Sequence, residues 1–244
     1  MQPFWAEFHG NPHSSEHSAG WGASKAVESS RTKVANFIGA DPDEIVFTSG
    51  ATEANNIAIK GLSIPKLRHG RRKTLLVSAM EHKCVLESAA YIGKIKGCLV
   101  LEIPVDGKGH VDLDKLKNML TEDVLLVSVA LVNNEIGTIQ DLSAISMLCR
   151  DVGAILHSDF AQAPSAVSLL DYADLADMVS LSGHKFGGPM GIGALYISRE
   201  LKDRIQPLFH GGKRAGCDPV RCLYLCVLAL AQPRISMPLR QVLP

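Results

Sequence analysis

The most informative stretch of this sequence runs from Met178 to Pro189 and reads Met-Val-Ser-Leu-Ser-Gly-His-Lys-Phe-Gly-Gly-Pro. It joins an apolar, strand-like run to a glycine-rich turn, with Lys185 between them. Most lysines are exposed, so the simplest interpretation is a strand-end side chain that reaches for water. The position also favours a buried amine, because desolvation disfavours the charged form and a neutral amine forms a Schiff base with an aldehyde. Pyridoxal phosphate is the cofactor that uses such a lysine most often.

Size and composition favour a globular enzyme-like domain. The 244 residues suffice for one larger α/β domain, and 46% hydrophobic content with zero formal net charge gives no support for disorder, nucleic-acid binding or a membrane-binding patch. The longest uncharged apolar stretch, Cys222 to Ala231, is about half the length of a membrane-spanning helix, and no signal peptide is evident. Six cysteines without regular spacing indicate reduced thiols and no metal site. We therefore expect a cytoplasmic protein.

Apolar runs rich in β-branched residues alternate with segments of helical period. Strands are predicted at 44–48, 74–78, 99–103, 124–131, 154–157, 178–181 and 192–197, and helices at 22–38, 52–61, 84–95, 113–119, 142–152 and 199–205. This alternation predicts an α/β fold with a mainly parallel sheet and helices on both faces. Ligands of such sheets collect at the carboxyl ends of the strands.

A turn of small residues follows the first predicted strand and reads Ser-Gly-Ala-Thr-Glu-Ala-Asn-Asn at 49–56. The free N–H groups and positive dipole end of a helix that starts there would bind a phosphate, and the hydroxyl of Thr52 would add to them. An ordinary helix N-cap explains the same residues equally well.

Polar side chains also follow other predicted strands. Asp159 needs a cationic partner at the end of a buried strand, which a protonated pyridine nitrogen would supply, and Gln162 lies one turn further on. Asn134 offers an amide donor, and His82 is suited to lie over a flat cofactor or to move a proton. Each has a plain alternative as a helix cap, a turn residue or a structural histidine. Their shared position at strand ends, together with Lys185, favours a pyridoxal phosphate site.

Ordered motifs connect these residues with a known family. They are Gly-Asn-Pro-His-Ser-Ser-Glu-His at 10–17, Thr-Ser-Gly-Ala-Thr-Glu-Ala-Asn-Asn at 48–56, Glu-His at 81–82, Asn-Asn-Glu-Ile-Gly at 133–137, His-Ser-Asp at 157–159 with Gln162, and Ser-Gly-His-Lys at 182–185. From about His9 to Gly212, the chain resembles the cysteine desulfurases of the class V aminotransferase family. The resemblance implies the large domain of a fold-type I, pyridoxal 5′-phosphate-dependent transferase. It also implies a homodimer that passes sulfur from L-cysteine to a sulfur-acceptor protein, for iron–sulfur cluster assembly or thiocofactor supply, and leaves alanine.

The resemblance assigns roles to individual residues. Lys185 would hold the cofactor covalently and move protons, His82 would stack on its ring, and Asp159 would pair with the ring nitrogen. Asn134 and Gln162 would face the phenolic oxygen, and Thr52, Ser182 and His184 would hold the phosphate. The implied catalytic residues are thus Lys185 and His82, and the cofactor-binding residues are Ala51, Thr52, Asn134, Asp159, Gln162, Ser182, His184 and Lys185.

The resemblance fails at both ends of the chain. The family's first strand, with its Asn-Ala-Thr-Thr-Pro-like turn, would precede Met1, and the residues after Gly212 do not match the family. Codons for residues 216–221, taken from the third base, permit Leu-Arg-Ser-Gly-Thr, which matches the family's Arg-x-Gly-Thr motif; chance is the rival explanation. We therefore expect a large domain at 1–212 without its first strand, and an out-of-frame tail at 213–244 in place of the small domain.

This tail bears on activity, because the family's carboxylate-binding arginine and nucleophilic loop cysteine would follow Gly212. None of the six cysteines aligns with that nucleophile, and we expect Cys84, Cys98 and Cys149 on core or helix faces. The leading hypothesis is a cysteine desulfurase by family, with weak or no activity as it stands. The alternatives are a non-catalytic remnant that binds pyridoxal phosphate, a related selenocysteine or cysteine lyase, and a class V aminotransferase.

Overall fold

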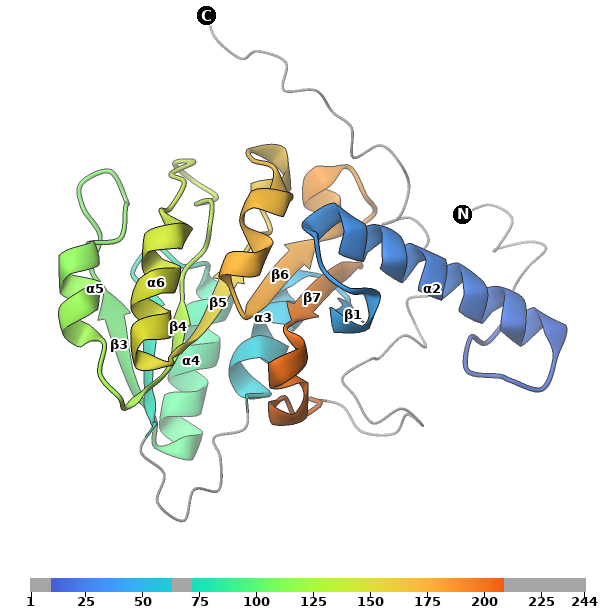
Figure 1. The fold of residues 1–244 in the computed structure, drawn as a ribbon, viewed down its shortest axis with the longest axis horizontal. Coiled ribbons are helices and arrows are strands. Elements are labelled where there is room, and N and C mark those ends of the chain that lie inside the picture. Colours follow the sequence, from blue (N-terminus) through green and yellow to red (C-terminus); the bar gives the residue numbers. More distant parts are fainter. Residues whose placement is uncertain (1–9, 63–71, 209–244) are drawn as a thin grey trace, which may run out of the picture.

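The computed structural model describes residues 10–62 and 72–208, so the expected tail at 213–244 lies outside the described residues. Its centre is a seven-stranded sheet in the order β1-β7-β6-β5-β4-β2-β3 (Figure 1). The strands are β1 (Ile45–Thr48), β2 (Thr74–Ser78), β3 (Leu99–Ile103), β4 (Val124–Ser128), β5 (Ile155–Asp159), β6 (Met178–Ser182) and β7 (Gly193–Ile197). Every predicted strand is therefore present, although β4 ends earlier than the apolar run that predicted it.

The sheet is mainly parallel, as predicted. The five strands β3, β2, β4, β5 and β6 run parallel to one another, while β7 is antiparallel to both β6 and β1. Gly193 on β7 pairs with Thr48 on one side and Ser182 on the other, so the carboxyl ends of β1 and β6 flank one residue. A Cβ atom at position 193 would lie 2.6 Å from the Cα of Gly50, which explains why glycine is needed where the turn after β1 approaches β7.

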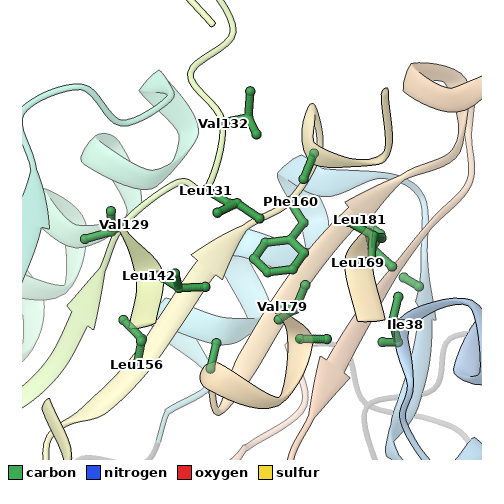
Figure 2. Packing of buried hydrophobic residues seen from close by; sticks show 14 of the residues in the cluster. Ile38, Val129, Leu131, Val132, Leu142, Leu156, Phe160, Leu169, Val179 and Leu181 are labelled. Atoms are coloured by element: carbon green, nitrogen blue, oxygen red, sulfur yellow. The ribbon is translucent and has the colours of Figure 1, made fainter. Parts of the chain in front are cut away.

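Helices cover both faces of the sheet, which confirms the predicted layers. One hydrophobic cluster packs α2 (Ser18–Ile38), α5 (Leu113–Met119) and α6 (Leu142–Val152) against the sheet, and Figure 2 shows its centre around Phe160 and Leu181. The other cluster packs α3 (Ala51–Lys60) and α4 (Lys83–Lys96) on the opposite face. Both faces of the central strands are thereby buried, so only their ends are left to form a site.

Two helix boundaries differ from the prediction. Helix α2 begins at Ser18 because the Nδ1 atom of His17 accepts a hydrogen bond from the N–H of Gly20 at 3.1 Å, a cap that hydrophobic periodicity does not reveal. The predicted helix at 199–205 is a 3₁₀ segment, η6 (Arg199–Arg204), whose acidic partners lie elsewhere in the chain. Among the described residues, no helix combines the length and the apolar character needed to cross a membrane.

Candidate functional site

A cavity of about 450 Å³ opens where the carboxyl ends of the strands meet. All nine side chains that the sequence singled out line it: Ala51, Thr52, His82, Asn134, Asp159, Gln162, Ser182, His184 and Lys185. They lie at the carboxyl ends of β5 and β6 or in the segments that follow β1, β2, β4, β5 and β6. The shared direction of the parallel strands therefore gathers residues that are far apart in the sequence, as expected for this kind of sheet.

One end of the cavity has the features of an anion site. Helix α3 starts there at Ala51, and its N-cap, Gly50, offers no side-chain hydrogen bond to the first turn. Glu53 in the first turn accepts the N–H of Ser49 through its Oε2 atom at 2.6 Å and so holds the turn before the helix. Across the turn, the Oγ atom of Ser182 lies 3.1 Å from Nδ1 of His184. Free N–H groups at a helix start, with hydroxyl and imidazole groups opposite, suit a phosphate.

Elsewhere in the cavity, the carboxyl group of Asp159 favours a positively charged ligand group. This residue is buried, and its carboxylate accepts hydrogen bonds from the N–H of Ala161 at 2.8 Å and from Nδ2 of Asn55 at 2.7 Å. Burial raises the pKa of Asp159, and the described residues contribute no ion pair to it. A buried carboxylate on a cavity wall is stabilised by a ligand that brings a positive charge, so the residues fit a protonated pyridine nitrogen.

Glu81, next to His82, is a second buried carboxyl group. Its Oε1 atom accepts the N–H of Ala130 at 2.5 Å, while Oε2 is buried without a hydrogen-bond partner among the described residues. Burial, and then the charge of Asp159, raises the pKa of Glu81 to about 8. Glu81 thus fixes the turn after β2 to a residue of the cavity wall and favours its neutral form at pH 7.

Two neighbouring asparagines divide structural and cavity roles between them. The Nδ2 atom of Asn133 donates to the carbonyl of Met80 at 3.1 Å, and its Oδ1 atom accepts the N–H groups of Glu135 and Ile136. Asn133 therefore shapes the turn after β4, while Asn134 is exposed on the cavity wall. His157 is likewise structural, because it lies buried between the hydroxyls of Ser128 and Ser180.

The structure corrects the sequence analysis at two positions. Lys185 lines the cavity but is exposed, so the predicted buried amine is wrong: the residue lies on a 3₁₀ turn, η5 (Gly183–Phe186), after β6 has ended. Cys84, expected on a core or helix face, also lines the cavity, because it lies in the first turn of α4, two residues after the N-cap His82. Asn55 was missed altogether, although it stands in the quoted motif three residues after Thr52, one helical turn away.

Residues 1–222 match the family described as aminotransferase class V. The chain belongs to this family. It is 45% identical over 212 residues to cysteine desulfurase IscS of Rickettsia rickettsii (strain Iowa), covering 87% of this chain and 51% of the relative. It is 44% identical to the mitosomal cysteine desulfurase of Encephalitozoon cuniculi (strain GB-M1), covering 87% and 49%. The chain thus spans about half the length of these curated relatives.

Solved structures of the family share the fold. A NifS-like protein superimposes with a TM-score of 0.87 at 34% identity, over 96% of this chain and 64% of that one. The structure described as SspA in complex with cysteine gives a TM-score of 0.87 at 32% identity, over 97% and 67%. These similarities confirm the fold-type I large-domain architecture that the resemblance implied.

Proposed function

We propose that this class V family member binds pyridoxal 5′-phosphate and carries the cofactor half of a cysteine desulfurase site, whose substrate is L-cysteine. The observation that carries the proposal is the cavity itself: a helix N-terminus for the phosphate, a buried carboxyl group without an ion pair among the described residues for the ring nitrogen, and Lys185 line the same cavity. Relatives named as cysteine desulfurases and the structural neighbour in complex with cysteine support this choice of substrate.

Each residue has a defined task in this proposal. When bound, pyridoxal phosphate withdraws electrons from the Cα of an amino acid. Asp159 keeps the ring nitrogen protonated, and the start of α3 with Thr52, Ser182 and His184 binds the phosphate. Asn134 and Gln162 donate to the phenolic oxygen, and His82 covers the ring. The Nζ atom of Lys185 would hold the cofactor and would serve as the base that takes up the proton from the substrate's Cα.

The wider context is proposed at the family level. We infer a homodimer that transfers sulfur to an acceptor protein in iron–sulfur cluster assembly, in keeping with the desulfurase names of the relatives. Free thiols at Cys84, Cys98 and Cys149 suit a reducing compartment such as the cytoplasm. The mitosomal name of one relative makes an organelle the competing location, which fractionation of the source cells distinguishes.

Borohydride reduction tests the cofactor assignment. The full chain, incubated with pyridoxal phosphate, reduced and digested, is expected to carry the pyridoxyl group on the peptide that contains Lys185. Lys185→Ala should abolish the label, and Lys83→Ala, an exposed lysine beside His82, should retain it. Labelling of another lysine, with Lys185 unmodified, contradicts the proposal.

Product analysis separates the enzyme classes. Alanine from L-cysteine, with sulfide released when a thiol reductant is added, supports a desulfurase. Preferential turnover of selenocysteine supports a lyase, and amino transfer to a keto acid supports an aminotransferase. Cofactor binding without any product favours the non-catalytic alternative, which we expect for the 244-residue chain if the tail at 213–244 is out of frame. Sequencing the nucleotides around codon 213 tests the frameshift, and a frame-corrected chain extended by the family's small domain should gain activity.

A further inference from the structure

Two side chains that the sequence analysis did not assign to the site connect the residues proposed to contact the ring. Asn55 on α3 is fully buried, and its Nδ2 atom donates to Oδ2 of Asp159 at 2.7 Å and to Sγ of Cys84 at 3.2 Å. The Sγ atom of Cys84 lies 3.0 Å from Nδ1 of His82. A continuous path of three hydrogen bonds therefore runs from Asp159 to His82, across α3 and the first turn of α4.

The groups at the two ends fix the direction of each hydrogen bond. At one end, Nδ2 of Asn55 points to Oδ2 of Asp159 at 2.7 Å, and the same amide group donates to Sγ of Cys84. In the ionised form of Asp159 the opposite orientation would place two acceptor oxygens within 2.7 Å of each other. At the other end, the backbone N–H of Cys84 can only donate, and it donates to Nδ1 of His82 at 3.2 Å. Nδ1 therefore carries no proton, and the ring proton lies on Nε2.

The directions of these hydrogen bonds also indicate whether the Cys84 thiol is protonated. Its sulfur accepts a hydrogen bond from Asn55 and faces the lone pair of Nδ1, so a neutral S–H that donates to His82 satisfies both neighbours. A thiolate would place two lone pairs, those of Sγ and Nδ1, against each other. Burial raises the pKa of the Cys84 thiol, which favours the neutral form further.

We infer that Asn55 and Cys84 are positioning residues that hold His82 in its Nε2–H form and aim the Asp159 carboxylate. His82 would then present a ring face and an N–H donor, and the base of the site would be Lys185 alone. The value of this arrangement for cofactor binding rests on the proposed function, whereas the hydrogen-bond path belongs to the chain without any ligand.

The tautomer of His82 tests the path directly. Long-range ¹H–¹⁵N correlation spectra of the full chain, labelled at histidine and free of cofactor, distinguish protonated from unprotonated ring nitrogens. We expect Nε2–H for His82 in the parent chain and in Cys84→Ser, whose hydroxyl still donates. Cys84→Ala keeps the backbone N–H donor to Nδ1, so it should retain Nε2–H, but its Nδ1 resonance should shift because the S–H donor is lost. The control Cys98→Ala, a buried cysteine outside the cavity lining, should leave that resonance unchanged. An Nδ1–H tautomer in the parent chain, or no change in Cys84→Ala, overturns the inference.

A double-mutant cycle on pyridoxal phosphate affinity tests the connection between the two residues. Asn55→Ala and Cys84→Ala should each weaken binding by about five- to tenfold, in the range of a lost hydrogen bond. Relative to the parent chain, the double variant should lose less affinity than the product of the two single losses, because both substitutions remove the same path. Fully multiplicative losses overturn the inference. If Asn55→Ala does not fold, Cys84→Ser and Cys84→Ala decide the matter through the Nδ1 resonance of His82, which should shift in Cys84→Ala. A parent chain that binds no pyridoxal phosphate refutes the proposed function but leaves the tautomer test valid.

Discussion

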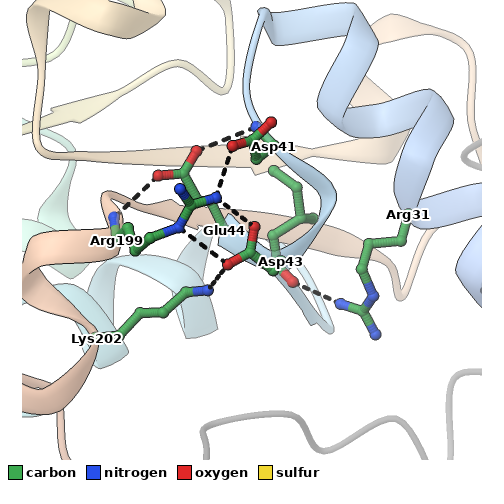
Figure 3. A network of polar contacts seen from close by, with 7 residues as sticks. Arg31, Asp41, Asp43, Glu44, Arg199 and Lys202 are labelled. Carbon is green, nitrogen blue, oxygen red and sulfur yellow. Dashed lines mark hydrogen bonds and ion pairs between the residues drawn. The ribbon is translucent and has the colours of Figure 1, made fainter.

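Acidic side chains occupy two contrasting regions of this molecule. At the surface, Asp43 receives Nη2 of Arg199 at 3.0 Å and Nζ of Lys202 at 2.6 Å, and Arg199 also reaches Asp41 at 2.6 Å (Figure 3). Hydrogen bonds from Arg199 and then Lys202 hold the pKa of Asp43 well below its usual range. At the cavity, burial raises the pKa of both Asp159 and Glu81.

The difference teaches which charges indicate a ligand. The surface network joins the 3₁₀ turn η1 (Pro42–Glu44) to η6, and each acid in it has its cation within the chain. Water screens such pairs, so they contribute little to stability. Among the described residues the buried carboxyls form no ion pair, and such an arrangement costs free energy. A cationic ligand bound in the cavity would offset this free-energy cost, which explains why buried carboxyl groups occur there.

The largest effect is expected at His157, which supports the buried region. Its ring nitrogens lie 2.8 Å from Oγ of Ser128 and 3.0 Å from Oγ of Ser180. His157→Ala would leave a cavity and two unpaired hydroxyls, and should lower the free energy of unfolding by about 3 kcal/mol at pH 7. Burial lowers the pKa of His157 from 6.5 to about 3, so the parent chain should lose stability as the pH falls below about 6.5, and the variant should lose less.

Urea unfolding at pH 7 and pH 5 measures this effect, with His110→Ala, an exposed histidine, as the control. A His157→Ala variant as stable as the parent chain would show that the buried hydrogen bonds do not support the site.

The next largest effect concerns the charge at the cavity. Asp159→Ala should raise the dissociation constant of pyridoxal phosphate about 30-fold, or about 2 kcal/mol, because the ring nitrogen loses its anionic partner. The free energy of unfolding without ligand should change less, since the Asp159→Ala variant no longer buries an unpaired carboxylate. Absorbance titration measures the affinity, and Asp151→Ala, at the exposed end of α6, is the control. Equal affinity in both variants would place the cationic ring elsewhere.

Glu81 sharpens the comparison through the pH dependence of stability. Its pKa in the folded chain, about 8, lies above the ordinary value of 4.5, so the folded state binds more protons between these pH values. Stability should therefore fall as the pH rises from about 4.5 to about 8, by about 1.4 kcal/mol per pH unit at most, relative to Glu81→Gln. Urea unfolding at pH 6, 7 and 8 measures the difference. Parallel curves for the two chains would show that Glu81 is ionised in the folded state.

The smallest effect is expected in the surface network. Asp43→Asn should lower Tm by about 2 °C or less, because Asp43, Arg199 and Lys202 are solvated. The lowered pKa means that the stabilisation exists above pH 3.8 and disappears as the pH falls below that value. Calorimetry in 0.1 M and 1 M salt measures it, with Asp114→Asn, an exposed residue on α5, as the control. A loss that persists in 1 M salt would mean that this network is not screened by water.

Much of the cavity was predictable because the relevant signals are local. Asp159 and Ser182 stand at the ends of apolar strands, and Ala51 and Thr52 follow a turn of small residues, so the direction of the parallel strands brings them to one edge. The role of Asn55 was not predictable in this way. It meets Asp159 across 104 residues of sequence, and nothing near either residue encodes that contact.

The sequence by itself determined the alternation of strands and helices, the edge of the sheet at which ligands collect, and the residue types available there, because backbone geometry repeats over a few residues. Only the tertiary structure decided that Lys185 is exposed, that Cys84 lines the cavity and that the backbone of Gly50 lies close to Gly193. Burial and hydrogen-bond partners depend on how α3, α4 and β7 pack together. The pKa values of Asp159 and Glu81 therefore belong to the folded chain and not to the motifs that contain them.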